Sequence, residues 1–210
     1  MLFATIAAIF LFKSSSELPL GIVGLCAITI ERMLTEIYKA LIRKENQEKY
    51  KIPSDLNIKA PQLAKRLGGF SLILVTGLLF YYIEVPNHIN PLILAALAGL
   101  GTAIGGMLKD APHEGFDILK FFRSPMVALV CGVIISTQFP GDINSKYFLL
   151  SIFGAERICS EFYKKILNGR LPGKFKETLT VSKKWEKKRK LILPVYTVCI
   201  LILVTLFVLK

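Results

Sequence analysis

Seven apolar segments, separated by polar runs, dominate the pattern of the chain. They are Leu2–Phe12, Leu18–Ile30, Gly68–Ile83, Pro91–Leu108, Pro125–Phe139, Tyr147–Ala155 continuing to Leu167, and Leu191–Leu209. Counted with their polar ends, several reach the roughly 18 to 20 residues that a helix needs to cross a bilayer. The pattern therefore predicts an all-α integral membrane protein with seven transmembrane helices.

Composition supports the same class. Hydrophobic residues make up 53% of the 210 positions, and the mean hydropathy is +0.52. A soluble domain of this size has more charge and fewer long apolar runs. Little of the chain is left for a sizeable soluble domain, and we expect a multi-pass protein of a plasma or inner membrane.

The net charge is +12, and the positions of its Lys and Arg residues indicate how the chain is oriented in the membrane. With seven crossings and the N-terminus inside, the inside segments 39–66, 109–123 and 164–190 carry 8, 3 and 11 Lys or Arg residues. The outside segments carry only Lys13, Lys146 and Lys210. This asymmetry predicts an inside N-terminus and an outside C-terminus. It argues against nucleic acid as a partner and favours anionic membrane lipids.

A nonapeptide occurs twice, 125 positions apart. Glu31–Lys39 (ERMLTEIYK) is repeated as Glu156–Lys164 (ERICSEFYK), with five of nine residues identical. The segments before and after the nonapeptide also correspond, and the basic segments that follow align on Pro53 and Pro172 with a shift of six residues. The chain is therefore predicted to contain an internal repeat.

The repeat predicts a 3+1+3 plan. Residues 1–85 form a first three-helix repeat, residues 86–123 a linker helix with an inner polar loop, and residues 124–210 a second three-helix repeat. Because one helix separates the halves, both enter the membrane from the same side and are parallel repeats. The plan is similar in architecture to that of SWEET-type sugar transporters, although none of that family's sequence motifs is present.

The repeated nonapeptide places ionisable residues inside the membrane. At 100° per residue the polar side chains form stripes that should face the protein interior or a wet cavity. Arg32 with Glu36 and Arg157 with Glu161 can pair at i,i+4. Glu31 and Glu156 have no obvious partner in their own helices. The predicted ion or solute site consists of Glu31, Arg32, Glu36, Tyr38, Glu156, Arg157, Glu161 and Tyr163.

Two interpretations of these clusters remain open. Two carboxylates near one axis would suit a cation or a proton, which predicts a transporter or channel for a cation, proton or small solute. Alternatively, Glu–Arg pairs could fix the register of the two halves, in which case the protein is a structural subunit of a membrane complex. A homo-oligomer is compatible with both.

A third interpretation is a membrane enzyme acting on a lipid headgroup at the inner face. The predicted loop Lys109–Pro125 holds Asp110, His113, Glu114 and Asp117, which could perform acid–base chemistry or bind a divalent metal. Their spacing matches no metal signature, so neither a metal site nor a cofactor is predicted. A polar turn at the interface is the simpler interpretation. No nucleotide-binding, serine-hydrolase or zinc-protease motif occurs, which favours a protein without enzymatic activity.

Basic residues on the inner side could contact lipid phosphates. The predicted contacts lie in Gly169–Lys176 and Lys183–Lys190 and are Arg170, Lys174, Lys187, Lys188 and Arg189. The four cysteines all fall in apolar helices without CxxC spacing, which predicts small buried side chains rather than disulfides or zinc ligands.

Overall fold

The computed structural model describes residues 9, 18–39, 48, 50–51, 64, 67–69, 71–72, 74–75, 85, 89–139, 141, 143–168, 175–176 and 178–208. The expected helix Leu2–Phe12 falls outside these residues except at Ile9, and the expected helix Gly68–Ile83 is described at only a few positions. The described structure is almost entirely helical.

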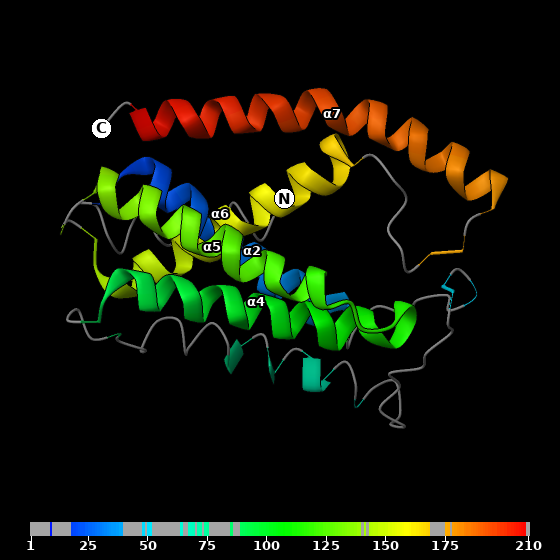
Figure 1. Cartoon of the computed structure of the whole chain (residues 1–210), viewed down its shortest axis with the longest axis horizontal. Helices are drawn as coiled ribbons and strands as arrows, with labels where there is room; N and C mark the ends of the chain where they lie inside the picture. The colour runs from blue at the N-terminus through cyan, green and yellow to red at the C-terminus, as the bar shows by residue number, and fades with distance from the viewer. Residues whose placement is uncertain are drawn as a thin grey trace.

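Five long helices and one π-helical turn form the described fold. In chain order they are α2 (Leu20–Ile37), α4 (Pro91–Glu114), α5 (Ile118–Gln138), α6 (Ser145–Phe162), the π-helix η3 (Tyr163–Leu167) and α7 (Leu179–Val208). Figure 1 shows α2, α4 and α6 running in one direction, while α5 and α7 run in the other. The helices form one bundle, with α6 between α2 and α5 and in contact with both.

Local sequence explains where the helices begin. Asn90 caps α4 by accepting a hydrogen bond from the Leu92 N–H, and Pro91 follows at the first helical position, where it costs no hydrogen bond. Asp117 caps α5, and Asn144 caps α6 in the same way as Asn90 caps α4. Each polar side chain satisfies backbone donors that the first turn leaves unpaired.

The expected inner loop Lys109–Pro125 is mostly helical. Helix α4 continues to Glu114, and α5 begins at Ile118. Only three residues separate the two helices, and the chain turns at Gly115, whose φ of 83° favours glycine. Pro125 lies inside α5 rather than at its start. The connection is shorter than its polar and proline-containing sequence indicated.

Among the residues that the structure describes, three helices are long and apolar enough to cross a membrane. The spans are Pro91–Leu108, Ile118–Gln138 and Ser182–Phe207. Helices α2 and α6 have 18 residues each, but their last turns carry the repeated charges. Large apolar side chains such as Leu97, Met126 and Leu201 are exposed on the outside of the bundle, as expected for a membrane protein.

The buried core lies where α2, α4, α5 and α6 meet. Its most buried members are small or aliphatic, and they include Ile22, Cys26, Ala95, Ala128, Ile135 and Ile152. Small residues let α4 approach α5 closely. A Cβ atom added at Gly99 would collide with the backbone of Pro125, and one added at Gly132 would lie 2.5 Å from the Ala95 Cβ.

The cysteines differ from the expectation of four buried side chains. Cys26 and Cys131 are buried, whereas Cys159 and Cys199 are exposed. The Sγ atoms of Cys131 and Cys159 lie 3.9 Å apart, between α5 and α6, and all four residues are free thiols. The apolar run around a cysteine predicts a helix, but it does not predict which face of that helix the cysteine occupies.

Candidate functional site

The repeated nonapeptide lies at the end of two helices that cross in close contact. Helices α2 and α6 run in the same direction (Figure 1). The Thr29 hydroxyl donates to the Leu150 carbonyl at 2.7 Å and also reaches the Leu25 carbonyl of its own helix at 3.2 Å. A Cβ added at Gly154 would collide with the Leu25 carbonyl oxygen. The two helix backbones therefore approach each other directly.

The two contacts are related by the spacing of the repeat. Thr29 and Gly154 are 125 positions apart, and so are Leu25 and Leu150. The contact of Thr29 with Leu150 and the contact of Gly154 with Leu25 are therefore counterparts: each joins a residue of one repeat to the equivalent partner in the other. Such reciprocal contacts are expected when a local twofold axis relates two segments.

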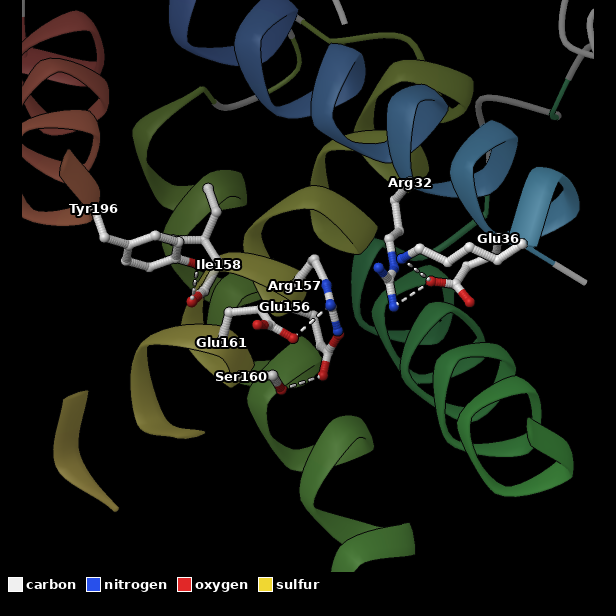
Figure 2. A network of polar contacts seen from close by, with 9 residues as sticks. Arg32, Glu36, Glu156, Arg157, Ile158, Ser160, Glu161 and Tyr196 are labelled. Carbon is white, nitrogen blue, oxygen red and sulfur yellow. Dashed lines mark hydrogen bonds and ion pairs between the residues drawn. The ribbon is translucent and has the colours of Figure 1, made fainter. Parts of the chain in front are cut away.

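Both expected Arg–Glu pairs are present. The Arg32 guanidinium lies 2.5 Å from Glu36 Oε1, and Arg157 forms the corresponding pair with Glu161 (Figure 2). All four side chains are half-buried. Each pair runs along its own helix at i,i+4, so each cation offsets the charge of a carboxylate on the same helix.

The two pairs belong to one cluster. Arg32 lies within electrostatic range of Arg157 and Glu161 in addition to its own Glu36. Helix α7 contacts α6 next to this cluster, where the Tyr196 hydroxyl donates a hydrogen bond to the Ile158 carbonyl at 3.2 Å (Figure 2). The sequence analysis expected the polar stripes of the two nonapeptides to face the protein interior or a wet cavity, and the structure shows that the helices that carry them are in contact.

Glu31 and Glu156 have partners that the sequence interpretation overlooked. The Thr35 hydroxyl donates to Glu31 Oε1 at 2.8 Å, and the Ser160 hydroxyl donates to Glu156 Oε1 at 2.6 Å. Both donors lie at i+4 on the same helix. The expectation that these carboxylates lack a partner in their own helix is therefore wrong, because it considered only charged residues as partners.

The two carboxylates differ in burial. Glu156 is only 2% exposed and is among the largest fully buried side chains, whereas Glu31 is half-buried. Burying a carboxylate is costly unless it is hydrogen-bonded, paired or protonated. The hydroxyl of Ser160 occupies one acceptor position of Glu156, and a carboxylate has about four such positions. Glu156 therefore has capacity to bind a proton or a cation.

The tyrosines of the two nonapeptides lie where the helix geometry changes. Tyr38 and Tyr163 are both exposed. Tyr163 begins η3, and the chain is also π-helical at residues 38–39. Single π-helical turns are rare and occur often at functional sites. The structure thus places a π-helical turn directly after the second Glu–Arg cluster, and two π-helical residues follow the first.

The four residues of the enzyme interpretation do not come together. In the residues that the structure describes, no group of three or more His, Cys, Asp or Glu side chains could hold a metal ion. Glu114 pairs with Lys120 at 3.0 Å, and Asp117 accepts hydrogen bonds from two backbone N–H groups at the start of α5. Asp110 also has an interaction partner.

His113 has a packing role that the sequence did not indicate. It is buried, and its ring stacks on that of Tyr50 at 4.2 Å between centroids. Tyr50 in turn stacks on Phe175 at 5.4 Å and forms an isolated antiparallel bridge with it. Tyr50 and Phe175 are also 125 positions apart. The alignment of the two basic segments on Pro53 and Pro172 is shifted by six residues, so it does not pair Tyr50 with Phe175. The constant offset of 125 residues does pair them.

The predicted lipid-phosphate contacts are only partly described. Arg170 and Lys174 lie outside the described residues. Lys187 and Lys188 are exposed, Arg189 is half-buried, and all three lie in the first turns of α7. The segment Lys183–Lys190 is therefore part of a continuous helix rather than of a preceding loop, and it carries a Lys190–Glu186 pair at 3.1 Å.

Comparison with known proteins finds no matching family model, no matching curated protein and no matching solved structure. A functional proposal therefore depends on the geometry of the side chains described above.

Proposed function

We propose that the chain is a polytopic membrane transporter or channel for a proton or another cation. In this proposal, seven helices cross the membrane as two parallel three-helix repeats joined by one helix, with the N-terminus inside and the C-terminus outside. Glu156 carries the functional proposal. Its carboxyl group is almost completely buried on a helix that packs in the centre of the bundle, with a hydroxyl donor at one oxygen.

The helix directions support the proposed topology. Seven successive crossings require the second, fourth and sixth helices to run one way and the fifth and seventh the other way. Helices α2, α4 and α6 run together, and α5 and α7 run against them (Figure 1). The parallel crossing of α2 and α6 also supports parallel rather than inverted repeats.

A buried carboxyl group can exchange between two neutral states. A buried carboxylate is stabilised by a partner that offsets its charge, and a bound cation is such a partner. The Ser160 hydroxyl can orient the carboxyl group in both states because it is a rotatable donor and acceptor. Glu156 can therefore load and release a positive charge without losing its position.

The neighbouring arginines are assigned a tuning role. Arg32 and Arg157 bind Glu36 and Glu161, so they remain held beside Glu31 and Glu156 rather than neutralising them. Their positive charge favours release of a cation from the site. Tyr38 and Tyr163, exposed at the ends of the same helices, are placed to line the inner exit.

The two alternative functions have less support. The enzyme interpretation requires Asp110, His113, Glu114 and Asp117 to converge, and the last three are occupied in a ring stack, an ion pair and a helix cap. The structural-subunit interpretation draws on Glu–Arg attraction between the halves, and although Arg32 lies within electrostatic range of Glu161, each arginine also pairs with a carboxylate of its own helix. Transport is therefore preferred.

Ion flux through proteoliposomes tests the proposal. Wild-type protein should dissipate an imposed proton, Na⁺ or K⁺ gradient, followed with an internal pH dye or by isotope uptake. Glu156→Gln preserves shape and removes the ionisable group, so we expect a loss of roughly tenfold or more in flux. Glu31→Gln should have a smaller effect, because Glu31 is half-buried.

Glu186→Gln provides the matched control. Glu186 is exposed on α7 and pairs with Lys190, outside the proposed site. Its flux should equal that of the wild type. Wild-type flux in the double variant Glu31→Gln/Glu156→Gln, or no flux of any of the three ions through the wild-type protein, would overturn the proposal.

A further inference from the structure

Arg123 has an unsatisfied donor inside the bundle. It lies on the second turn of α5, and its guanidinium carbon is 5.8 Å from the centre of the Tyr163 ring. Its Nε atom is buried and has no hydrogen-bond partner in the described part of the chain. A buried donor without a partner is uncommon and costly, because it has lost its contact with water. Such a donor points to a ligand.

Lys164 lies within electrostatic range of Arg123. It follows Tyr163 in η3 and is half-buried. Among the described residues neither Lys164 nor Arg123 forms an ion pair, although α5 and α6 carry three pairs close by. Burial lowers the pKa of the Lys164 ammonium from its ordinary value, and the positive charge of Arg123 lowers it further.

The nearby carboxylates do not cancel these two cations. Glu161 and Asp110 are close enough to favour the charged form of Lys164, but their effects rank behind those of burial and of Arg123. Glu161 is bound by Arg157, and Asp110 has an interaction of its own. Arg157 also adds positive charge near Lys164. Arg123 and Arg157 thus both lie within electrostatic range of Lys164, which places three cations at the start of α5 and the end of α6.

We propose that Arg123 and Lys164 form a binding site for a phosphate group between the beginning of α5 and the end of α6. A guanidinium group presents several N–H donors to an oxyanion, and an ammonium group adds a point charge. The Tyr163 ring lies over the Arg123 guanidinium, 5.8 Å from its carbon, and can hold the group in place by a cation–π contact. In the proposed topology this end of both helices meets the inner interface, where lipid phosphates lie.

The phosphate can come from a phospholipid headgroup or from free inorganic phosphate. Purified protein in a mild detergent distinguishes the two. Native mass spectrometry measures how much phosphatidylglycerol is retained, with diacylglycerol as a lipid that lacks phosphate. Calorimetric titration measures binding of inorganic phosphate. Retention of phosphatidylglycerol that millimolar phosphate does not displace assigns a lipid site, and binding of phosphate alone assigns a solute site.

Three variants test the two residues. Arg123→Gln and Lys164→Gln should each weaken binding roughly tenfold, since each removes a charge-assisted contact. Arg123→Lys retains a charge and should bind more tightly than Arg123→Gln, which separates ligand binding from a fold defect. Lys120→Gln is the matched control on α5. Lys120 is exposed and already pairs with Glu114, so binding should be unchanged.

Three results would overturn the proposal. They are no binding of either phosphate source by the wild-type protein, equal binding by the wild type and the Arg123→Gln/Lys164→Gln variant, and an equal loss in Lys120→Gln. The site goes beyond the proposed transport function and does not depend on it. Ion flux that is lost in Glu156→Gln but retained in Arg123→Gln would keep the two proposals separate.

Discussion

At the scale of single residues, Thr29 joins the two central helices with one hydroxyl group. Its hydrogen bond to the Leu150 carbonyl crosses from α2 to α6, and the residue is buried. Thr29→Val keeps the shape of the side chain and removes the hydroxyl. Hydrogen bonds between membrane helices contribute about 0.5–1.5 kcal/mol, so we expect the detergent-solubilised variant to lose stability of this size.

Thr102→Val is the control for this substitution. The Thr102 hydroxyl donates to Ala98, which lies on the same helix α4, so its removal should leave helix packing unchanged. Thermal unfolding of the two variants, followed by circular dichroism in one detergent, compares them directly. An equal midpoint for Thr29→Val and the wild type would show that the hydroxyl does not hold α2 against α6.

The sequence predicted which residues form ion pairs at the site, but it did not predict how deeply each side chain is buried. The i,i+4 spacing identified both Arg–Glu pairs correctly, because helical geometry alone brings such residues together. It did not distinguish Glu31 from Glu156, although one is half-buried and the other almost fully buried. Burial depends on which neighbours pack against each helix, and a repeated motif contains no information about those neighbours.

At the scale of helices, two glycines set how closely pairs of helices pack. Gly154 lets α6 approach the Leu25 carbonyl of α2, and Gly99 lets α4 approach Pro125 of α5. Gly154→Ala places a methyl group against backbone rather than against a flexible side chain, so the helices must separate. Overpacking of this kind typically costs about 1–3 kcal/mol. We therefore expect a lower unfolding midpoint and a lower yield of folded protein.

Gly105→Ala is the matched control, because Gly105 is also inside a long helix and a Cβ added there meets nothing within 4 Å. Alanine forms helices better than glycine, so this variant should be as stable as the wild type or more stable by up to about 1 kcal/mol. Equal stability of Gly154→Ala and Gly105→Ala in the same assay would contradict the close approach of α2 and α6.

Helix boundaries were harder to predict than helices. The polar run from Lys109 to Pro125 was interpreted as a loop, since it contains prolines, a glycine and several charges. The structure limits the connection to three residues. Only Gly115 has a conformation that breaks the helix, while Asp117 restarts it as a cap. Pro125 is accommodated because Gly99 of the neighbouring helix leaves space for it.

At the scale of the whole molecule, the offset of 125 residues recurs in space. It relates the two contacts between α2 and α6, and it relates Tyr50 to Phe175, whose rings stack at the same end of the bundle as His113. A residue that contacts its own counterpart lies on the axis that relates two repeats. These contacts support the proposed pair of repeats. The unduplicated His113 stacks on Tyr50 and makes the two halves unequal at that end.

The proposed orientation follows from charge, because the cell retains Lys and Arg on the inner side. Cysteines that replace Lys188 and Lys146 test it, in a chain whose four native cysteines are changed to alanine. Lys188 is exposed at the start of α7, and Lys146 lies in the first turn of α6, at the opposite end of the bundle. A membrane-impermeant maleimide added to intact cells should label Lys146→Cys, and it should label Lys188→Cys only after the membrane is permeabilised.

The reverse pattern would invert the topology and would move the proposed phosphate site to the outer leaflet. Labelling of both positions in intact cells would show that an odd number of crossings does not separate them, and the seven-helix plan would then fail.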